Sequence, residues 1–466
     1  MATEYKLSYT ANEINKKLGK VDGIENTIDQ ITTAISTERA RIDTIIETED
    51  AIKKRKNSTY KTISDMINDT ELENGMAVTT LGNGTDEALC CFYISDTQKD
   101  DLSIMLKNGL YANIAGHTID LTAISQNPFS LIPTALHNDY KHIIVSGNHT
   151  IDTTIVINDV MANKCVVEFT GKITLNTTLF KITRTNLIHF TGGIFYGNNN
   201  ILFDVPQETD SDRAGFTADK MYLDNCQLIN LCNSSGYIRF DRIYITETTS
   251  IPFAINGDGL SIPPNFCYFS NCSISGSFNI EQATHIYFNN CDFVNTQMNL
   301  ISSSNILFTS CNFVGKGRTN IVDDSRSVSF NGCVFECGAA ETLFIFKNNC
   351  RGLMINGNAI VDSSVGLLID ASEMTGYMKL DIKPTYIGVY LCDKIVISDD
   401  VSVETYFPII KDTLFTNRLL YDHVEINCMP NAFQTIPEAE NVYYDSGYIY
   451  LTGTEGTEYT IIPYHT

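Results

Sequence analysis

The sequence predicts a mainly β protein, a right-handed parallel β-helix with an N-terminal coiled-coil helix and a small β-rich C-terminal cap. Three observations support this prediction. A strand–turn–strand motif of eight residues recurs about every 20 residues through the middle of the chain. Isoleucines follow a heptad pattern near the N-terminus, and the last 50 or so residues are rich in Tyr and β-formers but lack the motif. The motif region is therefore expected to form stacked coils of parallel sheet.

The composition of the 466-residue chain narrows the classes of function. Its 32 Lys and Arg against 55 Asp and Glu give a net charge of −23 (32 − 55). Such a surface repels nucleic acid and anionic membranes, and an anionic ligand would need local Lys or Arg or a bridging cation. No apolar run is long enough to span a bilayer, and the N-terminus lacks the pattern of a signal peptide. The 14 Cys are therefore expected to remain reduced thiols of a protein made in a cytosol.

An isoleucine stripe predicts one long helix over residues 22–56. The isoleucines follow alternating steps of four and three residues, and only Glu38 and Glu49 interrupt the seam. Isoleucine at both core positions of the heptad favours three or four strands over two. The alternative is a single amphipathic helix packed on its own domain. The seam consists of Ile24, Ile28, Ile31, Ile35, Ile42, Ile45 and Ile52.

A small unit of short strands follows this helix. Apolar runs in GMAVTTLGNG, ALCCFYISD and LSIMLKNGLYANI are broken by Asn-Gly and Gly-Asn pairs, which favour turns. The pattern then loosens between residues 116 and 140, where Asn127-Pro128 acts as a breaker. We therefore expect four parts: an N-terminal segment with the coiled coil (1–70), a head unit (71–118), the β-helix (119–403) and the cap (404–466).

The eight-residue motif has a direct physical interpretation. Positions 1, 3, 6 and 8 are apolar, and positions 4 and 5 are small or polar residues that turn tightly. A strand, a corner and a second strand at a near-constant period predict about ten to twelve rungs, each about 4.8 Å high. The 46 residues between Met221 and Cys267 leave room for one degenerate rung near Ile238. Copies begin at Ile188, Met221, Cys267, Ile286, Ile306, Val328 and Leu353.

Two positions of the motif predict columns of like residues along the coil. Position 6 predicts a buried column of thiols that fill the core as small apolar groups. A metal site is not expected there, because metal ligands would have to converge from several directions. The column consists of Cys226, Cys272, Cys291, Cys311 and Cys333. Position 2 points outward, and there Tyr222, Tyr268 and Tyr287 could stack on sugar rings or pack beneath a loop or a neighbouring subunit. Asp292 and Asn312, at the outward position 7, could add polar contacts.

Charged residues gather in two loops between rungs. The loop 204–213 contains Glu208, Asp210, Asp212 and Arg213, and loops that leave a coil often shape a groove on it. A glycosidase would need two such carboxylates across a sugar, whereas the alternative is a solvated acidic loop. In the second loop, Asp323, Asp324 and Arg326 are expected to be turn residues in a surface ion pair. The eight His show no ligand spacing, so no cofactor or metal is predicted.

Three stretches of sequence carry a resemblance to a known family. They are the opening segment Ser8–Leu18, the head-like unit GMAVTTLGNG with CFYISD and NGLYANI, and the repeat itself. The chain resembles bacteriophage tail spikes and appendage proteins with a pectate-lyase-like β-helix. It departs from them in residues 116–140, which lack the Gly-Asp-Gly and Asp-Asp-Thr stretch through which such chains often begin the coil.

The resemblance implies a homotrimeric virion component. It would dock on other tail or neck proteins through its N-terminus and attach the particle to a host surface polysaccharide, without nucleic-acid or membrane partners. Three functions remain open, in this order: receptor binding without cleavage, glycan depolymerisation by hydrolysis or elimination, and a structural fibre or connector without a ligand. The residues expected to bind glycan are Tyr222, Tyr268, Tyr287, Asp292 and Arg213, and the candidate catalytic residues are Glu208, Asp210 and Asp212.

Overall fold

The computed structural model describes most of the middle of the chain and divides it into two compact units, residues 1–118 and 119–466. The heptad isoleucines and the three loop acids Glu208, Asp210 and Asp212 lie outside the described residues, so the coiled coil, the acidic site and the four-part division stay predictions. The described ranges are 58–81, 90–207, 213–232, 236–257, 260, 262–314, 318–336, 342–360, 367–384, 395–398 and 400–405, with the backbone of six later strands.

The first unit is built on a five-stranded sheet in the order β1-β2-β3-β5-β4. Strands β1 and β2 are parallel, and the other pairs are antiparallel. Alternate residues such as Val78, Phe92 and Ile94 are buried, which gives the sheet one apolar face. The elements are β1 (Ser58–Tyr60), α3 (Ile63–Asn68), β2 (Ala77–Thr80), β3 (Cys90–Ser95), β4 (Ile104–Met105) and β5 (Tyr111–Ile114).

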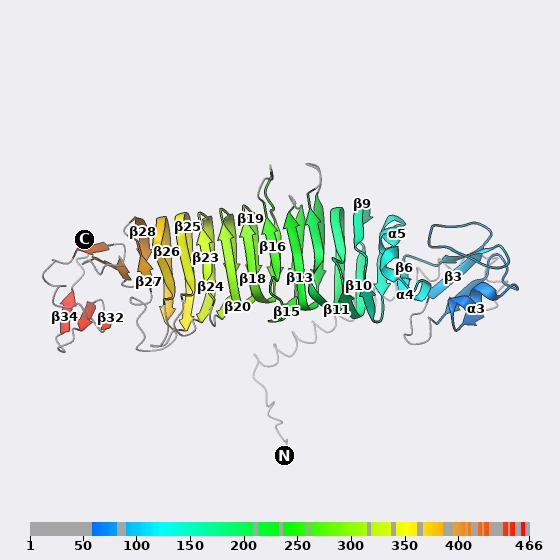
Figure 1. Ribbon diagram of the computed structural model, residues 1–466, viewed down its shortest axis with the longest axis horizontal. Helices are drawn as coiled ribbons and strands as arrows, with labels where there is room; N and C mark the ends of the chain where they lie inside the picture. The colour runs from blue at the N-terminus through cyan, green and yellow to red at the C-terminus, as the bar shows by residue number, and fades with distance from the viewer. Residues whose placement is uncertain are drawn as a thin grey trace, which may run out of the picture. The chain divides into compact units, whose positions relative to one another are not determined.

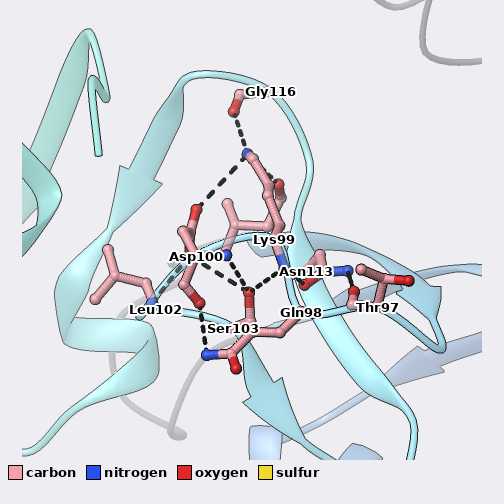
Figure 2. Close-up of polar contacts among 9 residues, drawn as sticks. Thr97, Gln98, Lys99, Asp100, Leu102, Ser103, Asn113 and Gly116 are labelled. Carbon is pink, nitrogen blue, oxygen red and sulfur yellow. Dashed lines mark hydrogen bonds and ion pairs between the residues drawn. The ribbon is translucent and has the colours of Figure 1, made fainter.

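A polar network holds the loop between β3 and β4 (Figure 2). The buried side chain of Asn113 accepts a hydrogen bond from the backbone N–H of Lys99 at 3.0 Å and donates to the carbonyl of Thr97 at 2.9 Å. The Lys99 ammonium group donates to the carbonyl of Ile114 at 3.1 Å. Both polar atoms of the buried amide therefore have partners, which removes the cost of burying it.

The second unit is a parallel β-helix of about 12 turns (Figure 1). One turn shows the plan: β19 (Thr284–Asn289) belongs to sheet 1, the start of β20 (Asp292–Ile301) to sheet 2, and the end of β20 to sheet 3. The next turn repeats this with β21 (Ser304–Thr309), β22 (Asn312–Val314) and β23 (Asn320–Asp323), all parallel and in register. The predicted mainly β fold with a parallel β-helix is confirmed.

The other strands of the coil extend this plan in both directions. Ile238 pairs with Cys267, which confirms the degenerate rung that the sequence left room for. The strands are β6 (Thr118–Asp120), β7 (His142–Val145), β8 (His149–Ile151), β9 (Ile155–Asn163), β10 (Val166–Leu175), β11 (Phe180–Pro206), β12 (Ala214–Asp219), β13 (Tyr222–Cys232), β14 (Tyr237–Asp241), β15 (Tyr244–Ile245), β16 (Phe253–Asn256), β17 (Cys267–Ser270), β18 (Ser273–Glu281), β24 (Arg326–Glu336), β25 (Phe344–Ile360), β26 (Ile369–Pro384), β27 (Ile395–Ile397) and β28 (Val401–Thr405).

Short helices cover the first turn of the coil, where the sequence shows only a loosened pattern. They are α4 (Leu121–Ile124), a 3₁₀ turn (Pro128–Leu131) and α5 (Ile132–His137), which lies beside β9 (Figure 1). Phe129, Ile132 and Leu136 are buried there and shield the open end of the apolar interior. None of the helices in the described part of the chain has the length and apolar composition needed to cross a lipid bilayer.

The parallel pattern changes at the C-terminal end. Strand β29 (Ile409–Lys411) pairs parallel with β27, but β30 (Arg418–Tyr421) and β31 (Val424–Asn427) follow it antiparallel. A separate antiparallel sheet contains β32 (Asn441–Asp445), β33 (Tyr448–Thr452) and β34 (Glu458–Ile461). These strands are the β-rich C-terminal segment that the composition predicts.

Aromatic rings and thiols stack in the interior of the coil. Successive ring centroids are 4.8 Å apart along the column Phe269, Phe288, Phe308 and Phe330. Each neighbouring thiol donates to the carbonyl of a Phe in the preceding rung at 3.5–3.9 Å: Cys272, Cys291, Cys311 and Cys333. These four thiols form the predicted column, and the described residues include no group of three or more His, Cys, Asp or Glu that could hold a metal ion.

One copy of the motif lies at a different corner of the coil, so two sequence-based placements are wrong. Tyr222 pairs with Ile194 and Tyr244 on sheet 2, not with the sheet-1 tyrosines. Cys226 pairs with Asn200, outside the thiol column. The reason is that every corner has the same apolar, turn and apolar pattern, so the motif alone does not tell which corner it forms.

We expect the described thiols to differ sharply in reactivity. Cys91 is exposed, whereas its neighbour Cys90 and the column are buried. Burial raises the pKa of Cys165 and of Cys226 to about 12, so little thiolate is present at pH 8. Brief treatment of the native protein with iodoacetamide should therefore alkylate Cys91 but not Cys90, Cys165, Cys226 or the thiol column. Peptide mass spectrometry would locate the alkylated residues. Cys90 is the built-in control, and its equal labelling would contradict the alternation in β3.

Candidate functional site

An aromatic surface covers part of sheet 1, and we call it the platform. Tyr268 and Tyr287 are in register on adjacent rungs and stack with ring centroids 4.9 Å apart. Tyr237 packs on Tyr268 at 5.1 Å, while Phe266 stacks on His285 at 5.1 Å and His285 adjoins Tyr287 at 6.5 Å. Five rings therefore form one continuous outward-facing surface along the coil axis. Flat aromatic faces of this kind fit the apolar faces of sugar rings.

An open depression of about 320 Å³ continues the platform toward the C-terminal side. Its lining combines aromatic, apolar and hydroxyl groups, which suits a polar ligand with apolar faces. The Nδ1 atom of His285 lies 3.0 Å from the hydroxyl of Thr284. The lining residues are His285, Tyr287, Asn305, Ile306, Leu307, Ser327 and Ser329.

The corner that carries two of the five platform rings has a left-handed backbone. Phe266 and His285 have φ values of 54° and 55°, and the next rungs place Asn305 and Ser327 at the same corner with 54° and 52°. Asn and Gly adopt this conformation at little cost, whereas a bulky side chain costs about 1–2 kcal/mol. A phenylalanine at this exposed corner therefore points to a surface role for its ring rather than to a need of the fold.

A second aromatic patch lies on sheet 2. Tyr222 and Tyr244 stack at 5.2 Å, and the Lys172 ammonium group lies 3.9 Å from the centre of the Tyr196 ring. Packing against its neighbours and the nearby Asp224 carboxylate raise the pKa of Tyr222, so its hydroxyl stays protonated and can donate. This sheet-2 patch has fewer contacting rings than the platform, and none of its rings lines the depression beside the platform.

A pair of carboxylates lies at the N-terminal side of the platform. The Arg242 guanidinium group donates to Asp219 Oδ2 and to Asp241 Oδ2, each at 2.9 Å. His189 Nε2 lies 3.4 Å from Asp219 Oδ1, which is buried and makes no hydrogen bond. His189 is three rungs from Tyr268 in the same outward column. A second carboxylate–imidazole contact, between His142 Nε2 and Glu168 Oε2 at 2.8 Å, lies two rungs further along the same column, so the Asp219–His189 contact is the nearer of the two to the platform.

The predicted binding residues are spread over more than one surface. Tyr268 and Tyr287 belong to the platform, and Tyr222 belongs to the sheet-2 patch. Asp292 is exposed on sheet 2, where its carboxylate accepts a hydrogen bond from Asn312 at 2.6 Å. Arg213 directly precedes β12, and its carbonyl accepts from Thr185 at 3.3 Å.

The expected ion pair in the loop after β23 is not formed. Asp323 accepts a hydrogen bond from Asn348 at 2.5 Å, and neither Asp323 nor Asp324 pairs with Arg326 within the described structure. The Asp324 backbone turns at a left-handed corner with φ of 43°, between the strand of Asp323 and that of Arg326. The sequence placed these residues close together in the chain but did not show that a corner separates their strands.

Three members of the platform were not predicted from the sequence: Tyr237, Phe266 and His285. Each stands one residue before a rung, ahead of Ile238, Cys267 and Ile286. Extending the motif by one upstream position would have shown an aromatic residue or a histidine there in three successive rungs.

Comparison with known proteins identifies the fold. No protein-family model matches the sequence, and no curated protein matches it. Among solved structures, full-length tailspike protein 2 of an Escherichia coli O157:H7 bacteriophage is similar with a TM-score of 0.55 and 11% identity, over 78% of this chain and 57% of that chain. The enzymatically active domain of bacteriophage CBA120 tailspike protein 2 gives 0.52 and 10%, over 73% and 60%. The chain thus spans under two thirds of the length of these proteins and shares their fold.

Proposed function

We propose that this chain, which has the β-helix fold of phage tailspike proteins, is itself a tail spike that binds a host surface polysaccharide. The observation that carries the proposal is the platform, five contiguous rings that face outward beside an open depression. Contiguous exposed aromatic surface on a folded protein is costly unless a ligand or partner covers it. A rigid parallel coil holds those rings at fixed spacing, which suits a polymer that runs along its axis.

The wider assembly belongs to the same proposal. The heptad isoleucines support a homotrimer, and the resemblance of the opening segment supports docking on other tail proteins through the N-terminus. The protein would then be a virion component whose β-helix projects toward the host. A structural fibre without a ligand is the weaker alternative, because it gives no reason for a bulky ring at the strained corner of Phe266.

Cleavage of the bound polysaccharide is the second candidate function. It is favoured by the buried Asp219 oxygen beside His189, since an imidazole and a carboxylate in contact can move a proton. The Arg242 guanidinium group donates to Asp219 and to Asp241 at 2.9 Å each, and these charge-assisted hydrogen bonds hold both carboxylates in place. The loop acids Glu208, Asp210 and Asp212 remain candidate catalytic residues of the same function.

The test is to measure binding and polymer length together. Purified full-length protein is incubated with surface polysaccharides from candidate hosts, with binding read by biolayer interferometry and length by size-exclusion chromatography. Replacing Tyr268 and Tyr287 together with Ala should weaken binding about 30-fold or more, because buried aromatic contacts dominate such interfaces. The matched control replaces Tyr222 and Tyr244 with Ala on sheet 2 and should bind like wild type.

Each result assigns the function. If the control loses binding while the platform variant keeps it, the site is on sheet 2 and the platform proposal fails. Shortened polymer would make the protein a depolymerase, and Asp219→Asn should then abolish cleavage while leaving binding intact. Unchanged length with binding supports a receptor-binding spike. No binding to any polysaccharide of a broad panel would favour the structural fibre.

A further inference from the structure

Two arginines lie beside the platform depression without an acidic partner among the described residues. Arg326 and Arg351 are in register on adjacent rungs, about 4.8 Å apart at the backbone. Both are exposed, and Arg326 directly precedes Ser327, which lines the depression. Like charges directly opposite each other on neighbouring strands are destabilising. The fold alone therefore gives no reason for this pair.

No acid offsets these charges in the described structure. The Arg326 guanidinium makes no hydrogen bond or ion pair with a described residue, and the Arg351 guanidinium donates only to the amide oxygen of Asn349, at 2.9 Å. Arg239 is a third such group, exposed at the opposite end of the platform and in register with Tyr268. Asp323 and Asp324 precede Arg326 in the chain, but neither pairs with it among the described residues.

A neighbouring arginine, Arg242, has acidic partners on two adjacent rungs of the coil. Arg242 bridges the carboxylates of Asp219 and Asp241 on adjacent rungs at 2.9 Å each. Both carboxylate oxygens of Asp241 accept hydrogen bonds, since the other oxygen accepts from the Asn271 side-chain amide at 2.8 Å. Arg239, two residues before Asp241 on the same strand, is left outside that network. Arg242 therefore has acidic partners at its corner, whereas the three arginines around the platform have none among the described residues.

We infer that the polysaccharide bound on the platform is anionic, and that Arg326, Arg351 and Arg239 bind its carboxylate or phosphate groups while the rings hold its sugars. This inference rests on the proposed function and names its substrate class. A guanidinium group matches a carboxylate or a phosphate with two parallel hydrogen bonds. Local cations are also what an acidic ligand needs on a protein with this excess of negative charge. The geometry fits a carboxylate group and a phosphate group equally well.

The experiment compares three polymer probes on the full-length protein: polygalacturonate for carboxylates, poly(glycerol phosphate) for phosphates and dextran as a neutral polymer. Wild type should bind one of the anionic polymers at least about tenfold more tightly than dextran, and raising the salt from about 0.05 to about 0.5 M should weaken this binding. The double variant Arg326→Gln, Arg351→Gln should lose about tenfold or more. The anionic polymer that responds identifies the source of the charge.

A charge-matched control separates local contacts from the effect of net charge. Lys61→Gln with Lys107→Gln removes two exposed cations in the other compact unit and should leave binding unchanged. Equal loss in both double variants would overturn the inference, because net charge alone would explain it. Binding of dextran that depends on Tyr268 and Tyr287 but not on the arginines would overturn the charge inference and leave the proposed function standing. Failure to bind any of the three polymers, or any host polysaccharide, would overturn both.

Discussion

Replacing Gly376 with alanine is expected to destabilise the β-helix by about 3 kcal/mol or more. Gly376 pairs with Cys350 on the adjacent rung and has a φ of 117°, a backbone conformation that is essentially restricted to glycine. A Cβ atom there would lie 2.1 Å from the Cys350 carbonyl oxygen, which belongs to a paired backbone and cannot move away alone. The measurement is the midpoint of urea unfolding followed by far-UV circular dichroism.

Gly236 is the matched control for this substitution. A Cβ atom added there meets nothing within 4 Å, and its φ does not lie in the glycine-favouring region. Gly236→Ala should change the unfolding free energy by less than about 0.5 kcal/mol. If Gly376→Ala unfolds at the same urea concentration as Gly236→Ala, then β25 and β26 do not approach each other in the register described.

The second large effect is expected from the centre of the aromatic column. Phe308 is fully buried and stacks on Phe288 and Phe330, with ring centroids 4.8 Å apart on both sides. Phe308→Ala removes a ring that joins three rungs and should cost about 3–5 kcal/mol, because the cavity left in a stacked column closes only in part. The chain has no Trp, so tyrosine fluorescence and circular dichroism report unfolding.

Leu307 is the control for this second prediction. It is the preceding residue on the same strand, but it points outward and is only half-buried. Leu307→Ala should cost about 1 kcal/mol or less. Equal costs for the two substitutions would mean that β21 has its faces exchanged, since a shift of one residue moves every side chain to the opposite face.

Much of the fold could be predicted from the sequence because its rules are local. Alternating apolar residues and a two-residue corner identify strands and turns within eight residues, and Phe288, Phe308 and Phe330 recur at the same place in each copy. The column of Cys272, Cys291, Cys311 and Cys333 could be predicted in the same way, because each cysteine occupies position 6 of its copy. The short helices before the coil were missed, since α4 and α5 have only four and six residues and show no full helical period.

The candidate site was harder to predict because its members come from different rungs. Tyr268 and Tyr287 were found, since both carry the outward position of a good copy. Tyr222 was placed with them because its copy matches equally well, although it forms another corner and lies on another sheet. Phe266 and His285 lie just outside the eight residues of the motif. They form part of an aromatic surface only because they stack on each other across adjacent rungs.

The sequence alone was therefore enough to predict the repeat, the inward and outward faces of its strands, and the residues that fill the core. These depend on side-chain alternation and turn chemistry, which act over a few residues. The contacts between surface residues, such as Tyr237 with Tyr268 or Arg326 with Arg351, could be found only in the folded coil. The physical reason is that rungs differ in length, from 19 residues between Cys267 and Ile286 to 29 between Ile238 and Cys267, so contacts between rungs follow the register of the sheets and not a fixed spacing in the chain.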